Sequence, residues 1–341
     1  MKGLINSMGN DRTARIAGVG SYTPEQVMTN QDLEEIVDTS DEWITKRTGI
    51  KERRIAKEDV TASDLAYQAA QVALKDADLA AEDLDLILVA TSTPDHLAFP
   101  STACILQDKL GIKEIPAFDV AAACTGFIYG VSTATQYIET GAYDNILLVG
   151  TEVFSKIIDW EDRDTCVLFG DGAGAAVLMP GEENGILANN LGADGSRSHV
   201  LEVPGGGSKK PISQQVLDER AHYVRMEGKA VFKFAVKVLG KAAEKALAEV
   251  KMTKDDIDYL IPHQANTRII DAAAKRLDLN RDQIHVNLDE YGNTSAASIP
   301  LALDEAVKEG EIAPGDIIVL VGFGAGLTWG ATVIEWTKGG N

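Results

Sequence analysis

Residues 118–127 read FDVAAACTGF and place one cysteine, Cys124, between two apolar segments. The apolar stretch that ends at Val120 predicts a buried strand, and residues 125–140 predict a helix that Gly141 ends at a C-cap position. Cys124 therefore lies between strand and helix, where unpaired backbone N–H groups and the helix dipole favour a thiolate. Because the thiolate is the nucleophile, this position suits a reactive cysteine. A small buried hydrophobe is the alternative.

The composition is that of a soluble globular enzyme. The chain has 341 residues, enough for a large core or two domains, with 45% hydrophobic and 25% charged residues. The net charge of −20 argues against nucleic acid or an anionic membrane as the main partner, and no apolar run is long enough for membrane insertion. The cysteines are Cys104, Cys124 and Cys166, an odd number without the spacing of a disulfide framework or a zinc site. We therefore expect a cytoplasmic protein without a metal.

Strands and helices alternate, which predicts an α/β fold, and the two halves resemble each other. DLILVA at 85–90 resembles DYLIPH at 258–263, and ILLVG at 146–150 resembles IVLVG at 318–322 at nearly the same offset. We therefore expect a duplicated domain, joined through the Gly/Asn-rich stretch 180–195. We expect the chain to divide into a leader at 1–11, an N-terminal half at 12–184 that carries the cysteine, and a C-terminal half at 185–341. The leader has no apolar core of the kind found in signal peptides, and Met8 is a second candidate start.

The second half carries a histidine and an asparagine that the duplication brings to the Cys124 seam. His263 ends a strand within IPHQANTR and leads into an expected helix at 265–277, and Asn293 lies in GNTSAAS. Taken alone, His263 could be a structural histidine at a helix start and Asn293 an N-cap. GFGAGLTWG at 322–330 lets the backbone approach a ligand, or forms a tight turn; it lacks the Lys-Ser/Thr end of a phosphate loop.

Four motifs in this order, AAACTGF, PHQAN, GNTSAAS and GFGAGLTWG, closely resemble the β-ketoacyl-acyl-carrier-protein synthase III family of the thiolase superfamily. The resemblance runs from about Ala14 to Trp336. It implies a five-layered αβαβα thiolase-like fold built from two pseudo-duplicated halves, and a homodimer. It also implies an acyltransferase that uses a coenzyme A thioester as a substrate and needs no cofactor.

The resemblance assigns Cys124 as the acylated nucleophile and His263 and Asn293 as the pair that binds the malonyl thioester carbonyl. The pairing is chemically reasonable, because loss of carbon dioxide leaves an enolate that needs hydrogen-bond donors, and a neutral His and an Asn amide both donate. Backbone N–H groups of Cys124 and Ala325 resemble a second oxyanion hole. Many relatives have Gly where this chain has Ala325, which fits only if the backbone there has negative φ.

The resemblance also gives residues for coenzyme A and for the acyl group. Trp43 and Arg163 are expected to sandwich adenine, although without the motif Trp43 reads as a core aromatic. The full set expected to bind coenzyme A is Thr39, Trp43, Arg47, Arg163, Gly228, Phe232 and Asn266. The acyl pocket is expected to be formed by Phe99 (from the partner subunit), Phe154 and Phe323. Such bulky rings favour a short primer such as acetyl and leave short branched primers open.

Basic residues recur every four positions in a segment that predicts a helix from Gly228 onward: Arg225, Lys229, Lys233, Lys237, Lys241 and Lys245. A solvated helix face is the usual meaning of such a stripe. In a chain of charge −20 it also suits an acidic partner, and Lys233, Arg268 and Lys275 resemble residues that dock acyl carrier protein in this family.

These observations predict an initiating condensing enzyme that joins a short acyl-CoA, expected to be acetyl-CoA, to malonyl-acyl carrier protein through an acyl-Cys124 intermediate. Two alternatives stay open. One is a synthase-III-like or plant-type polyketide synthase of secondary metabolism that uses another primer or malonyl-CoA. The other is an acyl-CoA-binding protein that keeps the fold without catalysis.

Overall fold

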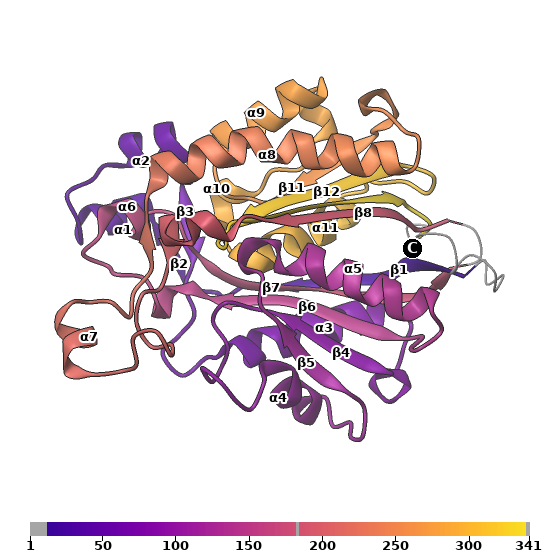
Figure 1. Cartoon of the computed structure of the whole chain (residues 1–341), viewed down its shortest axis with the longest axis horizontal. Coiled ribbons are helices and arrows are strands. Elements are labelled where there is room, and N and C mark those ends of the chain that lie inside the picture. Colours follow the sequence, from indigo (N-terminus) through magenta and orange to yellow (C-terminus); the bar gives the residue numbers. More distant parts are fainter. Residues whose placement is uncertain (1–11, 182–183, 339–341) are drawn as a thin grey trace.

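The computed structural model describes residues 12–181 and 184–338, so the expected leader at 1–11 lies outside it. Two sheets alternate with three layers of helices (Figure 1). The helices of these layers are α3 (Ala62–Asp76) and α4 (Thr102–Lys109) on one outer face, α5 (Gly126–Glu139) and α11 (Ser298–Lys308) in the middle, and α8 (Gly228–Glu249) and α9 (Thr267–Leu277) on the other outer face. The five-layered αβαβα arrangement is the one that the sequence predicted.

The two sheets repeat one strand order. The first sheet runs β1 (Thr13–Tyr22), β7 (Asp171–Gly181), β6 (Ile146–Val153), β4 (Leu86–Ala90) and β5 (Ala117–Val120). The second runs β8 (Ile186–Ala193), β13 (Thr328–Glu335), β12 (Ile317–Gly324) and β11 (Tyr259–Pro262).

The strand register repeats as well. Leu86 pairs with Ile146 in the parallel β4–β6 ladder, and Tyr259 pairs with Ile318 in the parallel β11–β12 ladder. In both sheets the next two ladders are antiparallel. The segments that resembled each other in sequence therefore occupy equivalent strands, which confirms the duplicated fold. The residue boundaries given to the two halves stay a prediction.

The stretch 180–195, which was expected to join the two halves, is mostly a β-strand. Most of it forms β8, which pairs with β13. Thr332 of β13 donates to Asn189 at 2.7 Å, and Asn190 donates to Glu249 of α8 at 3.0 Å, so both asparagines of β8 are hydrogen-bonded. Cross-strand pairing thus overrides the low strand propensity of Asn and Gly.

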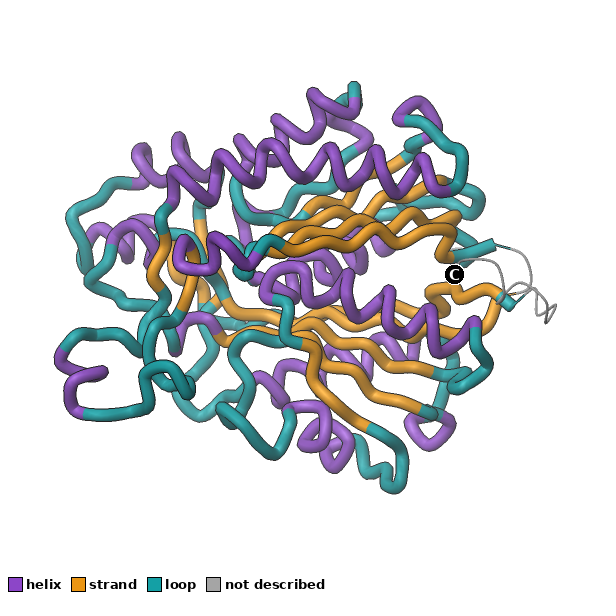
Figure 2. The backbone as a smooth tube through the Cα atoms, viewed as in Figure 1, coloured by secondary structure: helices purple, strands orange, loops and turns teal. Residues whose placement is uncertain are grey.

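The central helices have apolar residues on nearly every face because both sheets cover them (Figure 2). α5 begins two residues after Cys124, and α11 begins five residues after Asn293. The duplication therefore places both loops at the same end of the middle layer. No helix in the described ranges, 12–181 and 184–338, is long and apolar enough to cross a membrane.

Shorter elements complete the chain. They are α1 (Asn30–Glu34), α2 (Asp41–Thr48), α6 (Arg163–Cys166), α7 (Gln214–Asp218), α10 (Leu288–Tyr291), β2 (Val27–Thr29), β3 (Glu52–Arg54), β9 (Leu201–Glu202) and β10 (Arg225–Met226). Of these, α1, α2, α6 and α7 lie at the left end of the molecule in Figure 1. Gly49 ends α2 at φ +86°, and a Cβ there would lie 1.8 Å from the hydroxyl of Thr267. This close approach seats α2 against the start of α9.

Candidate active site

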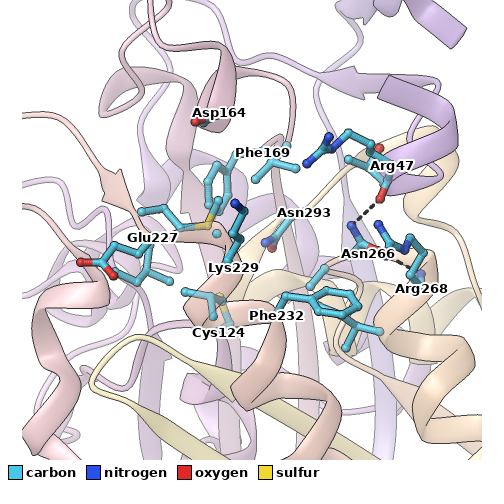
Figure 3. Close-up of a pocket in the computed structure, with 18 of the residues that line it drawn as sticks. Arg47, Cys124, Asp164, Phe169, Glu227, Lys229, Phe232, Asn266, Arg268 and Asn293 are labelled. Atoms are coloured by element: carbon cyan, nitrogen blue, oxygen red, sulfur yellow. Dashed lines mark hydrogen bonds between the residues drawn. The ribbon is translucent and has the colours of Figure 1, made fainter. Parts of the chain in front are cut away.

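Cys124 lies in a 3-10 turn, Ala123–Thr125, between β5 and α5, as the sequence predicted. Gly324 approaches the turn so closely that a Cβ there would lie 2.8 Å from the Cys124 nitrogen. The Cys124 side chain is 5% exposed and lines a cavity of about 780 Å³. The nucleophile predicted from sequence thus lies at a cavity between the two halves (Figure 3).

The structure differs from expectation in the protonation of this thiol. Burial raises the pKa of Cys124 to about 12, with a smaller contribution from the Glu152 carboxylate, while the Ser295 hydroxyl acts to lower it. Burial therefore outweighs the helix start that was expected to favour a thiolate. The resting cysteine is a neutral thiol, and its proton must leave before or during attack.

His263 follows β11 directly and is 1% exposed. Burial lowers the pKa of its imidazole to about 3, so the ring is neutral. Its Nδ1 lies 2.6 Å from the Ser298 hydroxyl oxygen. When the hydroxyl donates to Nδ1, the ring proton is placed on Nε2. His263 is then a neutral hydrogen-bond donor at the cavity wall.

Asn293 follows α10 and is fixed through its backbone and its side chain. Its N–H donates to the carbonyl of Leu168 at 2.8 Å, and its Oδ1 accepts from the Ser295 N–H at 2.9 Å. The N-cap of the turn Ser295–Ala297 is Thr294, so Asn293 is not the N-cap that was the alternative, although its Oδ1 accepts from the first N–H of that turn. Since Oδ1 is occupied, the Nδ2 amide is the group available as a donor to the cavity, which Asn293 also lines.

The glycine-rich loop joins β12 to β13 beside Cys124. The left-handed position in this loop is Gly326, at φ +131°, and Ala325 has no positive φ. A methyl group at Ala325 is therefore tolerated, which answers the doubt raised by Gly in many relatives. Phe323 and Gly324 line the cavity, with Ala325 next to them along the chain.

The cavity mouth is formed where α2, α8 and α9 meet. Trp43 lies between two guanidinium groups, since Arg47 and Arg163 are each 4.9 Å from its ring centroid. Asn266 caps α9 and donates from Nδ2 to the Arg47 carbonyl at 2.9 Å, as Figure 3 shows. This cap also explains why the helix expected from residue 265 begins at Thr267.

Of the residues predicted to bind coenzyme A, five line the cavity: Trp43, Arg47, Gly228, Phe232 and Asn266. Arg163 is not among the lining residues, but it covers Trp43 and donates to the Asp38 carbonyl at 2.7 Å. Thr39 also lies outside the lining, just before α2, and its buried hydroxyl has no hydrogen-bond partner.

Comparisons with known proteins agree with this geometry. A family model described as 3-oxoacyl-[acyl-carrier-protein] synthase III matches residues 118–195, and its C-terminal companion matches residues 247–336. A β-ketoacyl-[acyl-carrier-protein] synthase III of Desulfitobacterium hafniense is 57% identical over 95% of this chain and 98% of its own. One from Caldanaerobacter subterraneus is 58% identical with the same coverage. The chain belongs to the β-ketoacyl-[acyl-carrier-protein] synthase III family.

A solved member of this synthase III family shows the same fold. The crystal structure of 3-oxoacyl-[acyl-carrier-protein] synthase III from Aquifex aeolicus superposes with a TM-score of 0.88 at 47% identity, covering 95% of this chain and 100% of that one. The chain is thus an acyltransferase-type condensing enzyme with the thiolase-like fold.

The acyl end of the cavity differs in one respect from the prediction. Phe323 lines it and contacts the His263 ring edge-on, with centroids 5.5 Å apart. Phe154 does not line it. Phe169 does, and Phe154 stacks on Phe169 away from the lining, with centroids 4.5 Å apart. Both rings lie beside the same loop, so sequence spacing could not tell which one faces the cavity. Phe99 is 85% exposed and does not line the cavity of its own chain.

The basic residues of α8 all lie on the surface. α8 and α9 pack side by side (Figure 1), and their contact includes an ion pair between Arg276 and Glu244 at 2.7 Å. Lys233, Arg268 and Lys275 are exposed on these two helices. Arg268 also lines the cavity and covers the Phe232 ring at 5.0 Å. Of the predicted docking residues, Arg268 therefore lies at the cavity, and Lys233 and Lys275 are exposed on the two helices that carry it.

Three polar residues next to the Cys-His-Asn set received no role from sequence. Ser298 and Ser295 lie within the GNTSAAS motif, and Glu152 lies in the fully buried and largely apolar strand β6. A charged residue in a fully buried strand is a signal that sequence reasoning could have used. Ser298 and Ser295 became identifiable only once the fold placed them beside His263 and Cys124.

Proposed function

We propose that the chain starts fatty acid synthesis by condensing a short acyl-CoA with malonyl-acyl carrier protein. The products are a 3-ketoacyl-acyl carrier protein, coenzyme A and carbon dioxide. One observation carries the proposal: Cys124, His263 and Asn293 line the same cavity, whose mouth is formed by Trp43 and Arg47. A cavity with a nucleophile inside and an aromatic-cationic mouth suits a thioester on a long pantetheine arm.

In the first half of the cycle the Cys124 sulfur attacks the acyl-CoA carbonyl and expels the coenzyme A thiolate. The negative charge on the carbonyl oxygen is stabilised by the backbone N–H groups of Cys124 and Ala325. Close packing of Gly324 on Cys124 supports this pairing, because it brings the two loops together. Trp43 and Arg163 would hold the adenine, with Arg163 moving off the indole ring to admit it.

In the second half the malonyl thioester carbonyl accepts hydrogen bonds from His263 Nε2 and Asn293 Nδ2. Loss of carbon dioxide generates the enolate directly, so no base has to remove a carbon-bound proton and we propose no resident cofactor. A neutral imidazole suits this step, because an imidazolium would be a proton source for the carbanion. The enolate then attacks the acyl-Cys124 thioester.

We propose that the exposed basic face of α8 and α9 docks the acidic carrier protein, through Lys233, Arg268 and Lys275. We also propose a cytoplasmic homodimer. The support for a dimer is an exposed apolar pair, Leu97 at 76% and Phe99 at 85%, which a partner subunit would cover. A mass in solution of twice the 36.5 kDa chain is expected.

The first experiment is mass spectrometry of acyl carrier protein after incubation with the protein, acetyl-CoA and malonyl-acyl carrier protein. Acetoacetyl-acyl carrier protein is expected, and none with Cys124→Ser. Acetylated Cys124 without product would mean that the acceptor or the primer is wrong. Turnover with malonyl-CoA in place of the carrier-bound substrate would favour the polyketide alternative, and an enzyme never acylated at Cys124 would favour the binding-protein alternative.

A further inference from the structure

The resting Cys124 is a neutral thiol, so its proton needs an acceptor. His263 is a poor one, because burial disfavours its protonated form and its Nδ1 is held by Ser298. The next titratable group is Glu152 on β6, which is fully buried. The mechanism above does not use it.

Glu152 is enclosed by donors from two segments. Thr93 donates to its carboxylate at 2.6 Å and the Ser92 N–H at 3.1 Å, both from the loop after β4. The Ala296 N–H approaches it at 3.4 Å from the second half. None of these partners is a cation, so the carboxylate keeps a basic character that an ion pair would remove.

Ser295 connects this carboxylate to the nucleophile. The turn Ser295–Ala297 packs against both the Cys124 turn and β6. The Ser295 side chain is fully buried there, and its hydroxyl acts to lower the pKa of both Cys124 and Glu152. The hydroxyl has no hydrogen-bond partner in the structure, so no existing hydrogen bond has to break when it turns toward either group. Its backbone is held at φ +49°, a costly conformation for a serine, and that turn packs against Gly150, where a Cβ would lie 2.2 Å from the Ala296 carbonyl.

We propose that Glu152 is the proton acceptor for Cys124, acting through the Ser295 hydroxyl. The Cys124 S–H proton passes to Ser295 Oγ, the Ser295 O–H proton passes to Glu152, and the sulfur forms the bond to the thioester carbonyl carbon. When coenzyme A leaves as a thiolate, Glu152 gives its proton to Ser295 Oγ, and the Ser295 O–H proton passes to the coenzyme A sulfur, because the Cys124 sulfur is by then acylated. Atoms and charges balance without another reactant.

The charged surroundings of Glu152 are simple. The titratable group that faces it is Cys124. Asp171, on the neighbouring strand β7, pairs with Val153, so its side chain lies on the opposite face of the sheet from Glu152. Burial raises the pKa of Glu152 to about 7, despite the hydrogen bonds that lower it, which places this group near the pH at which a general base is effective.

The proposal rests on the proposed role of Cys124 as the nucleophile. It is tested with iodoacetamide, which needs neither acyl-CoA nor carrier protein. The rate of Cys124 alkylation is measured by intact mass spectrometry between pH 5.5 and 9.5 for the wild type, Glu152→Gln, Ser295→Ala and Asp171→Asn. Asp171→Asn is the matched control, because it neutralises another buried carboxyl of the same sheet that accepts hydrogen bonds from Ser155 and Ala56.

The wild type and Asp171→Asn are expected to share a rate that rises through about pH 7 and then levels off. In Glu152→Gln and Ser295→Ala this rise is lost, and the rate at neutral pH falls by about 100-fold, the size of a general-base contribution. Alkylation of Glu152→Gln at or above the wild-type rate would overturn the proposal, since it would mean that the carboxylate only repels the thiolate. If the pH dependence of Cys124 alkylation is unchanged in Ser295→Ala, the Ser295 hydroxyl does not transfer the proton, and the proposed path is wrong. A wild type that is not alkylated at Cys124 would instead count against the proposed function itself.

Discussion

The imidazole of His263 and the hydroxyl of Ser298 meet at 2.6 Å, Nδ1 to Oγ, inside the protein. The contact joins the end of β11 to the first residue of α11. It determines which ring nitrogen carries the proton, and so whether His263 presents a donor to the cavity. A residue that never touches the substrate thereby controls one that does.

Ser298→Ala is therefore expected to impair malonyl decarboxylation more than acylation of Cys124. Without the hydroxyl, the ring divides between two tautomers and two orientations, and kcat for condensation falls by about tenfold, or about 1.4 kcal/mol of transition-state stabilisation. Carbon dioxide release and Cys124 acetylation are measured in separate single-turnover experiments. Ser298→Thr, which keeps the hydroxyl, serves as the control. Equal losses in both half-reactions would mean that Ser298 only supports the fold.

Trp43→Ala is expected to weaken coenzyme A recognition without changing the chemistry. Loss of the stacking surface between Arg47 and Arg163 raises KM for acetyl-CoA by about tenfold, because aromatic stacking on a base contributes about 1–3 kcal/mol. Acetyl-pantetheine lacks the adenine, so its kcat/KM should be unchanged. If both substrates lose the same factor, Trp43 is a structural residue of α2.

Much of this site follows from local sequence. Cys124 and His263 each lie where a strand ends, Asn293 lies just after the short helix α10, and the internal repeat predicts that these loops meet. The protonation states do not follow from local sequence. The pKa of Cys124 depends on how much apolar protein surrounds it, and that protein comes from both halves.

The acyl wall shows a second kind of failure. Phe154 and Phe169 flank the segment 155–168, which includes α6, and their stacking places Phe169 rather than Phe154 at the cavity. The low strand propensity of Gly and Asn similarly hid β8, which exists because β13 offers it a partner. Tertiary contacts determine both outcomes.

The stacked pair Phe154 and Phe169 gives a matched test of primer selection. Phe169→Leu removes a ring that lines the cavity, so kcat/KM for butyryl-CoA relative to acetyl-CoA should rise by about tenfold, within the range that one or two methylenes allow. Phe154→Leu removes a ring that does not line the cavity and should destabilise the fold by about 1–2 kcal/mol with little change in preference. Steady-state kinetics and urea unfolding separate the two effects. If Phe154→Leu shifts the preference for butyryl-CoA more than Phe169→Leu does, Phe154 forms the acyl pocket, as the sequence predicted.

Lys233→Glu combined with Lys275→Glu tests the docking face. Charge reversal should raise KM for malonyl-acyl carrier protein by about tenfold at low salt, less at high salt, and leave KM for acetyl-CoA unchanged. Two single variants serve as controls. Lys245→Glu changes a lysine that lies about 18 Å from Lys233 along α8. Lys229→Glu changes a lysine that lines the cavity. A carrier-protein KM that responds equally to Lys245→Glu would mean that only net charge matters.

His285 gives a prediction about stability, away from the cavity. Its Nδ1 lies 2.8 Å from Glu311 and its Nε2 3.3 Å from Glu305. Burial acts to lower the pKa of His285, but the two carboxylates outweigh it and raise the pKa above the usual 6.5. A raised pKa means that the charged histidine stabilises the fold fully below pH 6.5 and that this stabilisation is lost as the pH rises through the higher folded value.

His285→Gln should therefore lower the free energy of unfolding by about 1–2 kcal/mol more at pH 6 than at pH 9, measured by urea unfolding at both values. Because the pKa values of Glu305 and Glu311 are lowered, their share of the stabilisation is lost only at acid pH, below the usual 4.5. An equal cost of His285→Gln at pH 6 and pH 9 would show that the histidine is neutral throughout and that the contact is an ordinary hydrogen bond.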